Sequence, residues 1–283
     1  MEVWKIGKVK ITRVLDLQQN IDLRHLIPEA TPDNMSPMET WLKPHFINDD
    51  GTIPLSIHAF LLESEGIKIL VDTCIGNDKS RPMPDWHMRQ GHFLERLTGA
   101  GVEREAVDFV LCTHLHVDHV GWNTILENDA WVPTFQNARY LIGKDEWEYW
   151  KDEEDPFGAE AKDDSILPVI EAGLVDFISS DHQITSEVKL IPTPGHTPGH
   201  VSVKIESEGR CGVITGDLFH HPVQFAKPNW KDIADVQPDI AQDSREVFLK
   251  QYSNDTLVLG THFAHPTAGK IIPDNGSYKF QVD

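Results

Sequence analysis

Three histidines and one aspartate fall within six consecutive residues of this chain, directly after an apolar run. They are His114, His116, Asp118 and His119, in the sequence HLHVDH. Side chains two residues apart in an extended segment point the same way, so His114 and His116 can bind one metal ion from one side. A turn after them would direct Asp118 and His119 toward a second position. Imidazole nitrogen and carboxylate oxygen suit zinc, so the segment favours a metal site over a solvated polar loop.

Three further segments place the same kinds of side chain after apolar runs. His196 lies in the stiff turn TPGHTPGH, Asp217 follows the run CGVITG, and His262 follows the run LVLGT. In open α/β sheets, ligands bind beyond the ends of the strands. We therefore expect these segments and HLHVDH to meet at one site.

The elements that must position these residues are strands and helices in mixed order. Apolar runs predict strands at 55–62, 67–72, 106–113, 139–143, 187–192, 200–206, 211–216 and 256–261. Helical spacing of apolar residues predicts helices at 88–99, 165–174 and 238–252. Strands mixed with helices in both halves of the chain indicate an α/β layered architecture.

The N-terminal residues differ from the rest of the chain. Residues 1–17 alternate between apolar and polar side chains like one or two strands, whereas residues 18–54 show little periodicity. We expect one domain over residues 1–283, with residues 1–54 as an N-terminal strand plus an irregular arm. The arm carries Leu26, Ile27, Met35, Met38, Trp41 and Phe46. No helix or strand period would bury these side chains internally, which predicts a homodimer that covers them, with the chain's own pocket as the competing location.

Composition restricts the partners of the chain. Among its 283 residues, 45 are acidic and 25 are Lys or Arg, which gives a formal charge of −20. Such a chain repels polyanions, so nucleic acid and anionic membranes are not expected partners. No apolar run approaches the roughly 18 residues of a membrane span, and the three cysteines lie far apart in the sequence. We expect a small-molecule substrate and a cytoplasmic location.

Four short segments together resemble the signature of the metallo-β-lactamase superfamily. They are HLHVDH, the PGH of residues 194–196, the GD of residues 216–217 and the GTH of residues 260–262. The resemblance covers residues 55–265 and implies a four-layer αβ/βα sandwich with two divalent metal ions per chain, expected to be Zn²⁺. Such a pair of cations would lower the pKa of a bridging water and hold a hydroxide for attack on a carbonyl or phosphoryl group.

The resemblance also assigns a role to each residue of the site. It implies that His114, His116 and His196 bind metal one, that Asp118, His119 and His262 bind metal two, and that Asp217 bridges the two metals. It further implies that Asp72, in the sequence VDTCIG, orients a ligand histidine. Asp118, Asp217 and His220 are the expected catalytic residues.

Departures from other branches of the superfamily narrow the expected activity. His116 stands where the diiron flavoproteins have Glu, and Asp217 supplies a carboxylate that the true β-lactamases lack. Only 21 residues follow His262, too few for the helical domain of glyoxalase II, and the acidic charge disfavours the nucleases. Residues 216–225 are similar to the branch that contains methyl parathion hydrolase and the lactonases. We expect a zinc-dependent hydrolase of lactones, aryl esters or phosphotriesters; the alternatives are a mononuclear iron oxygenase, a sulfur-handling enzyme, a β-lactam hydrolase or a metal-binding protein without activity.

His220 stands three residues after the expected bridging aspartate, where many lactonases have Tyr. It could donate a hydrogen bond to a substrate oxygen or only pack beside the site, and the sequence favours neither. Four aromatic residues could line an apolar pocket, although each alone is more often part of a core. They are Trp86, Trp122, Phe219 and Phe225.

Overall fold

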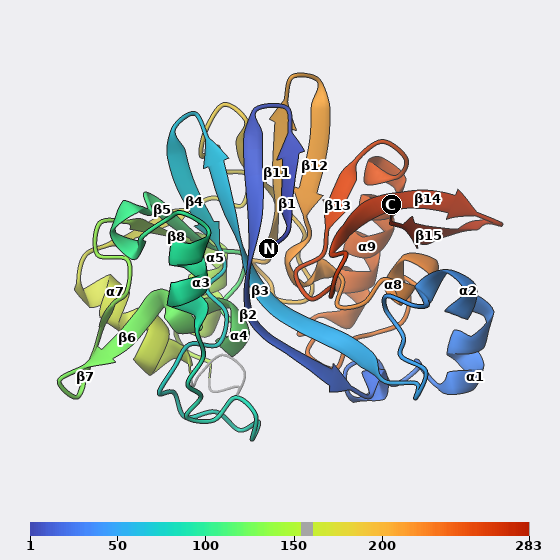
Figure 1. Ribbon diagram of the computed structural model, residues 1–283, viewed down its shortest axis with the longest axis horizontal. Coiled ribbons are helices and arrows are strands. Elements are labelled where there is room, and N and C mark those ends of the chain that lie inside the picture. The colour runs from blue at the N-terminus through green and yellow to red at the C-terminus, as the bar shows by residue number, and fades with distance from the viewer. Residues whose placement is uncertain (154–160, 283) are drawn as a thin grey trace.

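Two β-sheets face each other in the computed structural model, which describes residues 1–153 and 161–282, and helices cover both outer sides (Figure 1). Apolar side chains of both sheets meet in one central core, among them Phe60 and Leu111 from the first sheet and Val203 and Ile214 from the second. Two further cores fill the spaces between each sheet and its helices. Three buried interfaces make four layers, so the expected αβ/βα sandwich is confirmed.

The first sheet has seven strands in the order β1-β2-β3-β4-β5-β8-β9. The strands are β1 (Val3–Ile6), β2 (Val9–Ile21), β3 (Ile53–Ser64), β4 (Ile67–Val71), β5 (Phe109–Cys112), β8 (Arg139–Gly143) and β9 (Val175–Ile178). The strands from β1 to β4 pair antiparallel, and those from β4 to β9 pair parallel. β4 and β5 therefore end at the same edge of the sheet, which is where HLHVDH begins.

The second sheet has six strands in the order β10-β11-β12-β13-β14-β15. They are β10 (Val188–Pro192), β11 (Val201–Ser207), β12 (Arg210–Ile214), β13 (Leu257–Leu259), β14 (Ala268–Asp274) and β15 (Ser277–Gln281). β12 and β13 pair in parallel, so the segments that carry Asp217 and His262 leave the sheet at the same edge. A separate hairpin is formed by β6 (Thr124–Glu127) and β7 (Ala130–Pro133).

The helices are short, except for the one that covers the second sheet. The first sheet carries α3 (Phe93–Gly99), α4 (Val117–Val120), α5 (Lys144–Trp150) and α7 (Leu167–Glu171). The second sheet carries α8 (Val223–Ala226) and α9 (Pro238–Tyr252), and the arm carries α1 (Pro32–Met35) and α2 (Glu39–Leu42). Single turns of other helix types are η1 (Leu23–His25), η2 (Ser36–Met38), η3 (Arg104–Ala106), η4 (Gly121–Asn123), η5 (Lys162–Ile166) and η6 (Gly216–Leu218).

Most of the strands and helices expected from the sequence are present. The eight expected strands occur with ends that differ by at most three residues, and α9 has the expected bounds. The helix expected at 88–99 begins only at Phe93, and the one expected at 165–174 is a π-helical turn followed by α7. β6, β7, β9, β14 and β15 were not expected, because their short runs mix exposed positions with half-buried and buried ones.

The N-terminal arm is more regular and more buried than its sequence indicates. β2 continues to Ile21, and the residues after it form single helical turns. Ile27, Met35, Met38 and Phe46 are buried in the core against the second sheet, with Leu26 and Trp41 packed against them. The premise of the dimer prediction was therefore wrong, because the chain buries these side chains itself. No helix in the described part of the chain is long and apolar enough to cross a membrane.

Candidate metal centre

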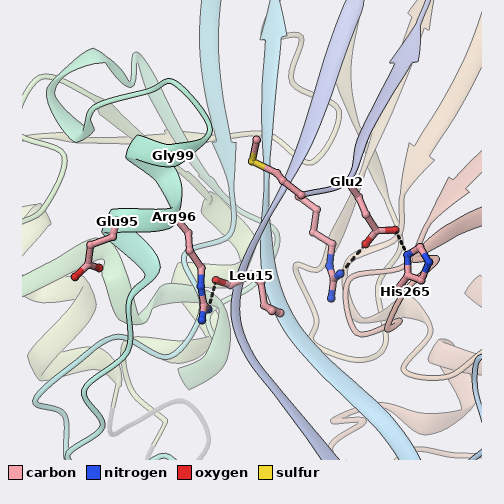
Figure 2. A pocket seen from close by; sticks show the side chains of 8 residues that line it. Glu2, Leu15, Glu95, Arg96, Gly99 and His265 are labelled. Atoms are coloured by element: carbon pink, nitrogen blue, oxygen red, sulfur yellow. Dashed lines mark hydrogen bonds and ion pairs between the residues drawn. The ribbon is translucent and has the colours of Figure 1, made fainter.

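A cavity of about 640 Å³ lies between β2, α3 and the segment after β13, away from the predicted site residues (Figure 2). Its charged side chains already have partners. Arg13 pairs with Glu2 at 2.6 Å, and Arg96 donates to the backbone oxygen of Leu15 at 2.7 Å. Nδ1 of His265 donates to the other carboxylate oxygen of Glu2 at 2.7 Å. None of the residues that the sequence predicts for the site lines this cavity.

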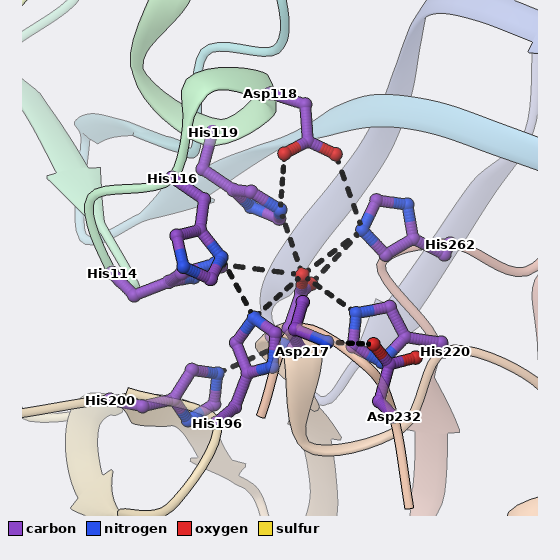
Figure 3. Close-up of polar contacts among 12 residues, drawn as sticks. His114, His116, Asp118, His119, His196, His200, Asp217, His220, Asp232 and His262 are labelled. Atoms are coloured by element: carbon purple, nitrogen blue, oxygen red, sulfur yellow. Dashed lines mark hydrogen bonds and ion pairs between the residues drawn. The ribbon is translucent and has the colours of Figure 1, made fainter. Parts of the chain in front are cut away.

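Segments from both sheets meet at one cluster of histidines and aspartates (Figure 3). His114 and His116 follow β5, and α4 carries Asp118 and His119. From the second sheet come His196 after β10, Asp217 after β12 and His262 after β13. The structure thus brings together all seven residues that the sequence predicts as metal ligands.

The HLHVDH segment has the local geometry that its sequence predicts. His116 is extended, with φ −69° and ψ 156°, and it is the last residue before α4. His114 and His116 therefore lie on one side, and the helical turn directs Asp118 and His119 to another. The neighbouring turn holds α4 in place, because the Thr73 N–H donates to the His119 oxygen at 2.7 Å and the Gly121 N–H donates to the Cys74 oxygen at 2.7 Å.

The donor atoms of the seven predicted ligands form two adjoining groups, and His220 forms a third, overlapping group with Asp217 and His262. In each group, one nitrogen or oxygen atom per residue lies within 4.8 Å of the others. The first group is His114, His116, His196 and Asp217, and the second is Asp118, His119 and His262. Within the first group, Nδ1 of His116 lies 3.1 Å from Nε2 of His114 and 2.9 Å from Nε2 of His196.

The carboxylate of Asp217 lies between the two groups. Its Oδ2 atom is 3.5 Å from His114, 3.1 Å from His119 and 3.4 Å from His196, and its Oδ1 atom is 3.1 Å from His262. Asp217 is 2% exposed. This arrangement matches the bridging position that the sequence resemblance implies for it.

The donor set fits divalent cations. Nε2 of His119 and Oδ1 of Asp217 are buried and make no hydrogen bond in the described part of the chain. Burying such atoms without a hydrogen bond is costly, whereas a cation between them would satisfy both. Histidines and carboxylates are also the ligand types that zinc prefers. Two cations would therefore fit, one in each group.

Hydrogen bonds on the outer nitrogen of four histidines turn the inner nitrogen toward the centre. Nδ1 of His119 donates to Asp72 at 3.0 Å, Nδ1 of His196 donates to Asp235 at 3.1 Å, and Nδ1 of His262 donates to the backbone oxygen of Ser56 at 3.0 Å. Nδ1 of His114 lies 3.1 Å from the Thr113 hydroxyl. In each case Nε2 faces the other donor atoms, which is the orientation that metal-binding histidines take from such partners.

Asp72 lies where the sequence predicts it, at the end of β4. Besides His119, its carboxylate accepts the N–H of Thr113 at 2.8 Å, so it fixes the residue just before the HLHVDH segment. Asp72 has a left-handed φ of 60°, and Cys74 has a φ of 53°. Both residues thus adopt the left-handed backbone conformation, which residues other than glycine rarely adopt.

The sequence did not single out Asp235, which holds His196. Asp235 lies in the irregular segment before α9 and is 7% exposed. Its carboxylate also accepts two hydrogen bonds from Arg245, at 3.1 and 2.8 Å. Burial raises the pKa of Asp235, but His196 and Arg245 outweigh it and leave the pKa below its usual range. No local motif marks this residue, because its partners come from distant segments.

His200 is a second residue whose place the sequence did not reveal. It belongs to the TPGHTPGH turn, yet its Nε2 atom accepts the backbone N–H of Asp217 at 2.9 Å. Burial lowers the pKa of His200 to about 3, so the ring is neutral and can accept. Gly216 has a φ of 55°, and a Cβ there would lie 2.5 Å from the His200 ring. The His200 ring therefore holds the backbone of Asp217 in place through this hydrogen bond.

Protonation of the histidines follows from their surroundings. Burial lowers the pKa of His114 and of His116 well below the usual value, so both are neutral, the form that binds metal. Burial also disfavours charge on His119, but Asp217, Asp118 and Asp72 outweigh it and raise its pKa. Burial raises the pKa of Asp217, but His119, His262, His220 and His114 outweigh it and hold that pKa well below its usual range.

His220 lies inside the cluster. Its Nε2 atom is 3.1 Å from Oδ2 of Asp217, its Nδ1 atom is 3.3 Å from Asp232, and its ring stacks on that of His262 at 5.3 Å. Burial lowers the pKa of His220, but Asp232 and Asp217 raise it to about 9. A protonated imidazole at this position can donate a hydrogen bond. No sequence motif marks Asp232 as a partner of His220.

A cavity of about 280 Å³ opens onto the cluster. Its polar wall includes His116, Asp118, Asp217 and His220, and its apolar wall includes Ile21, Leu26, Leu55, Met83, Trp86 and Ile233. Of the four aromatic residues suggested by the sequence, Trp86 alone lines it. Trp122 stacks on Phe93 in the core against the first sheet, and Phe219 and Phe225 lie in the core against the second.

Two facing sheets with a buried His/Asp cluster at the ends of their strands define a protein of the αβ/βα sandwich class with a candidate metal centre. The chain belongs to the metallo-beta-lactamase superfamily, whose family model matches residues 52–262. The family that the sequence resembles is thereby confirmed.

Curated relatives and solved structures add three specific similarities. An N-acyl homoserine lactonase of Bacillus cereus is 26% identical over 216 residues, which cover 70% of this chain and 78% of the relative. The structure of AbOPH, a hydrolase of the beta-lactamase superfamily, has a TM-score of 0.79 and 26% identity, covering 98% of this chain and 95% of that one. The structure of AidC, a dizinc quorum-quenching lactonase, has a TM-score of 0.80 and 23% identity, covering 100% and 97%.

Proposed function

We propose that this chain is a dinuclear metal-dependent hydrolase that cleaves ester-like bonds in small neutral molecules, with lactones as the first substrate class to test. One observation carries the proposal: the buried carboxylate of Asp217 lies within 3.5 Å of histidines from three other ligand segments. The lactonase relatives and the hydrolase with a similar structure support the reaction class. Zinc as the native metal and a cytoplasmic location belong to the same proposal.

Seven residues would hold the two metals. His114, His116 and His196 would bind one, Asp118, His119 and His262 would bind the other, and Asp217 would contact both. Two divalent cations in these positions would activate water and polarise the substrate oxygen. Asp72 and Asp235 would keep their histidines oriented toward the metals.

The remaining residues of the cavity would act on the substrate directly. His220 can donate a hydrogen bond to a substrate oxygen, because its ring lines the cavity beside the cluster and the carboxylate of Asp232 lies 3.3 Å from its Nδ1 atom. Met83, Trp86 and Ile233 would pack against an apolar substituent and exclude water around it. The formal charge of −20 disfavours polyanionic substrates such as nucleic acids.

A homodimer stays a prediction. Its original basis was the apolar arm, and these side chains are buried within the chain. Light scattering at micromolar concentration would measure the oligomeric state directly, and a monomer would contradict the prediction.

Metal content and a substrate panel test the proposed function together. We expect elemental analysis to give two zinc ions per chain, and a chelator to abolish hydrolysis until Zn²⁺ is returned. We expect measurable kcat/KM on N-acyl lactones and aryl esters, a lower value on phosphotriesters, and very little on anilides and phosphodiesters. One metal per chain at saturation, iron with oxygen uptake, or strong phosphodiesterase activity would overturn the proposal.

A further inference from the structure

Glu146 is a buried carboxylate that joins the two loops of the first donor group. It lies in the first turn of α5 and is 1% exposed. Its Oε1 atom accepts the backbone N–H of Leu115 at 3.1 Å, and Leu115 is the residue between His114 and His116. Its Oε2 atom accepts the backbone N–H of Gly199 at 2.9 Å, in the turn that carries His196. One side chain thus connects a loop of the first sheet to a loop of the second.

The aromatic neighbour of Glu146 extends this connection to a predicted ligand. Nε1 of Trp150 donates to Oε1 of Glu146 at 2.7 Å, one helical turn along α5. The Trp150 ring in turn packs edge-on against the His116 ring, with centroids 5.3 Å apart. Glu146 therefore fixes both the backbone beside His116 and the aromatic wall against which its ring rests.

The loop of His196 packs directly onto the backbone of α5. A Cβ at Gly199 would lie 2.3 Å from the backbone nitrogen of Glu146 and 2.6 Å from its Cα atom, so only glycine allows this approach. A small displacement of the Glu146 carboxylate would therefore shift the loop rather than be absorbed by a gap. The position of α5 and the separation of the two loops depend on each other.

The contact between Glu146 and the two loops is made by a buried carboxylate that has no cationic partner among the described residues, which is unusual for a purely structural contact. Among the ion pairs of residues 1–153 and 161–282, none involves Glu146, and its three hydrogen-bond donors above are neutral N–H groups. Burial raises the pKa of its carboxyl group. A buried carboxylate without a cationic partner is costly, and an apolar side chain in the same space would avoid that cost. The two oxygens of the Glu146 carboxylate instead accept one backbone N–H group from each of the two loops.

We propose that Glu146 is a positioning residue that sets the distance between His114 and His116 on one loop and His196 on the other, and so prearranges the first metal site. The inference rests on the proposed function, because it takes these histidines as ligands. Residues that hold metal ligands through hydrogen bonds commonly change metal affinity by 10–100-fold when replaced. Asp72 and Asp235 each orient one histidine, whereas Glu146 would act on two loops at once.

Metal release tests the inference. We would load the full chain with Zn²⁺, add excess chromophoric chelator, and follow the release rate of each ion in wild type, Glu146→Gln and Glu146→Ala. Glutamine can accept only one of the two N–H groups, and alanine accepts neither. We expect one of the two ions to be released about 10-fold faster from Glu146→Gln and up to about 100-fold faster from Glu146→Ala. The visible spectrum of the Co²⁺-loaded variants should change in the same order.

Glu148→Gln is the matched control, because it makes the same chemical change on an exposed side chain of the same helix. We expect it to release both ions at the wild-type rate. Trp150→Phe removes one donor to Glu146 and should give a smaller acceleration in the same direction. Trp150→Phe also tests the inference if Glu146→Ala does not fold.

Two results would separate the inference from its basis. Wild-type release rates and an unchanged Co²⁺ spectrum in Glu146→Gln, with only a lower free energy of unfolding of the metal-free chain, would make Glu146 a structural residue and overturn the inference. A wild-type chain that binds fewer than two Zn²⁺ ions, or binds them without hydrolysing any substrate of the panel, would instead contradict the proposed function.

Discussion

Asp235 connects a histidine of the candidate centre to the longest helix of the protein. Its Oδ1 atom lies 3.1 Å from Nδ1 of His196, while Arg245 on α9 donates to both of its carboxylate oxygens. Arg245 is fully buried and also donates to the backbone oxygen of Leu218 at 2.8 Å, next to Asp217. One guanidinium group of α9 therefore supports two of the four ligand segments.

Replacing Arg245 with Met should destabilise the fold strongly. The change leaves Asp235 buried without its cationic partner, and breaking a buried pair in this way costs about 3–5 kcal/mol. Urea unfolding of the metal-free chain measures the loss. Lys250→Met on the same helix is the control, because Lys250 is 71% exposed and should change stability by less than about 0.5 kcal/mol. Equal effects of the two variants would contradict the role given to Arg245.

Asp217→Asn should reduce hydrolysis far more than folding. The amide keeps the shape of the side chain but loses the charge that faces the surrounding histidines. Residues that only orient metal ligands commonly contribute 10–100-fold, so we expect kcat/KM to fall by at least about 100-fold. Elemental analysis should show weaker retention of metal, and circular dichroism should show an unchanged fold. Near-normal hydrolysis with both metals bound would disprove the bridging role.

His220→Phe should separate two kinds of substrate. The alkoxide that leaves from a lactone is basic and gains from a hydrogen-bond donor, whereas a nitrophenolate needs no proton. We expect kcat/KM to fall about 100-fold on lactones and about 10-fold or less on nitrophenyl esters. Asp232→Asn, which keeps the ring but removes the carboxylate beside Nδ1, should give an intermediate loss on lactones. Equal losses on both substrate classes would reduce His220 to a packing residue.

Lys79 should make stability rise with pH. Its ammonium group is fully buried, donates to Thr124 at 2.8 Å and lies 3.7 Å from the centre of the Trp131 ring. Burial lowers its pKa to about 7. Above that pH the folded chain has lost this proton while the unfolded chain, with a lysine pKa of about 10.4, still holds it. The penalty of burying the charge is therefore fully present below pH 7 and is relieved as the pH rises from about 7 toward 10.

Lys79→Met isolates that effect. Other groups titrate equally in both chains, so the difference in unfolding free energy between wild type and Lys79→Met reports on Lys79 alone. We expect wild type to gain about 2 kcal/mol relative to the variant between pH 7 and pH 9. Urea unfolding of the metal-free chains at both pH values measures it. A difference that stays constant over this range would contradict the lowered pKa.

The ligand segments could be predicted because their chemistry is written in short stretches of sequence. HLHVDH places four ligand-type residues within six positions, and PGH, GD and GTH each follow an apolar strand. Strands with continuous apolar runs, such as β5 and β12, were found for the same reason. The directions in which the ligand side chains of one segment point follow from the periodicity of its backbone alone.

The residues that support the ligands could not be predicted in this way. Asp232, Asp235 and Glu146 are three of 45 acidic residues, and nothing near them in sequence marks them as buried. Their partners lie up to 53 residues away, as for Glu146 and Gly199. The arm was misjudged for a related reason, because Ile27 and Phe46 pack on side chains of the second sheet that lie far along the chain.

Each of the two groups of predicted metal ligands contains residues from both sheets. The chain up to Ile178 supplies His114, His116, Asp118 and His119, and the chain from Val188 onward supplies His196, Asp217 and His262. A break in the short connection between β9 and β10 would therefore divide the protein into two polypeptides, each with an incomplete set of donors for either metal. Uptake of zinc by a mixture of the two would then signal that the halves have reassembled, as in a split reporter.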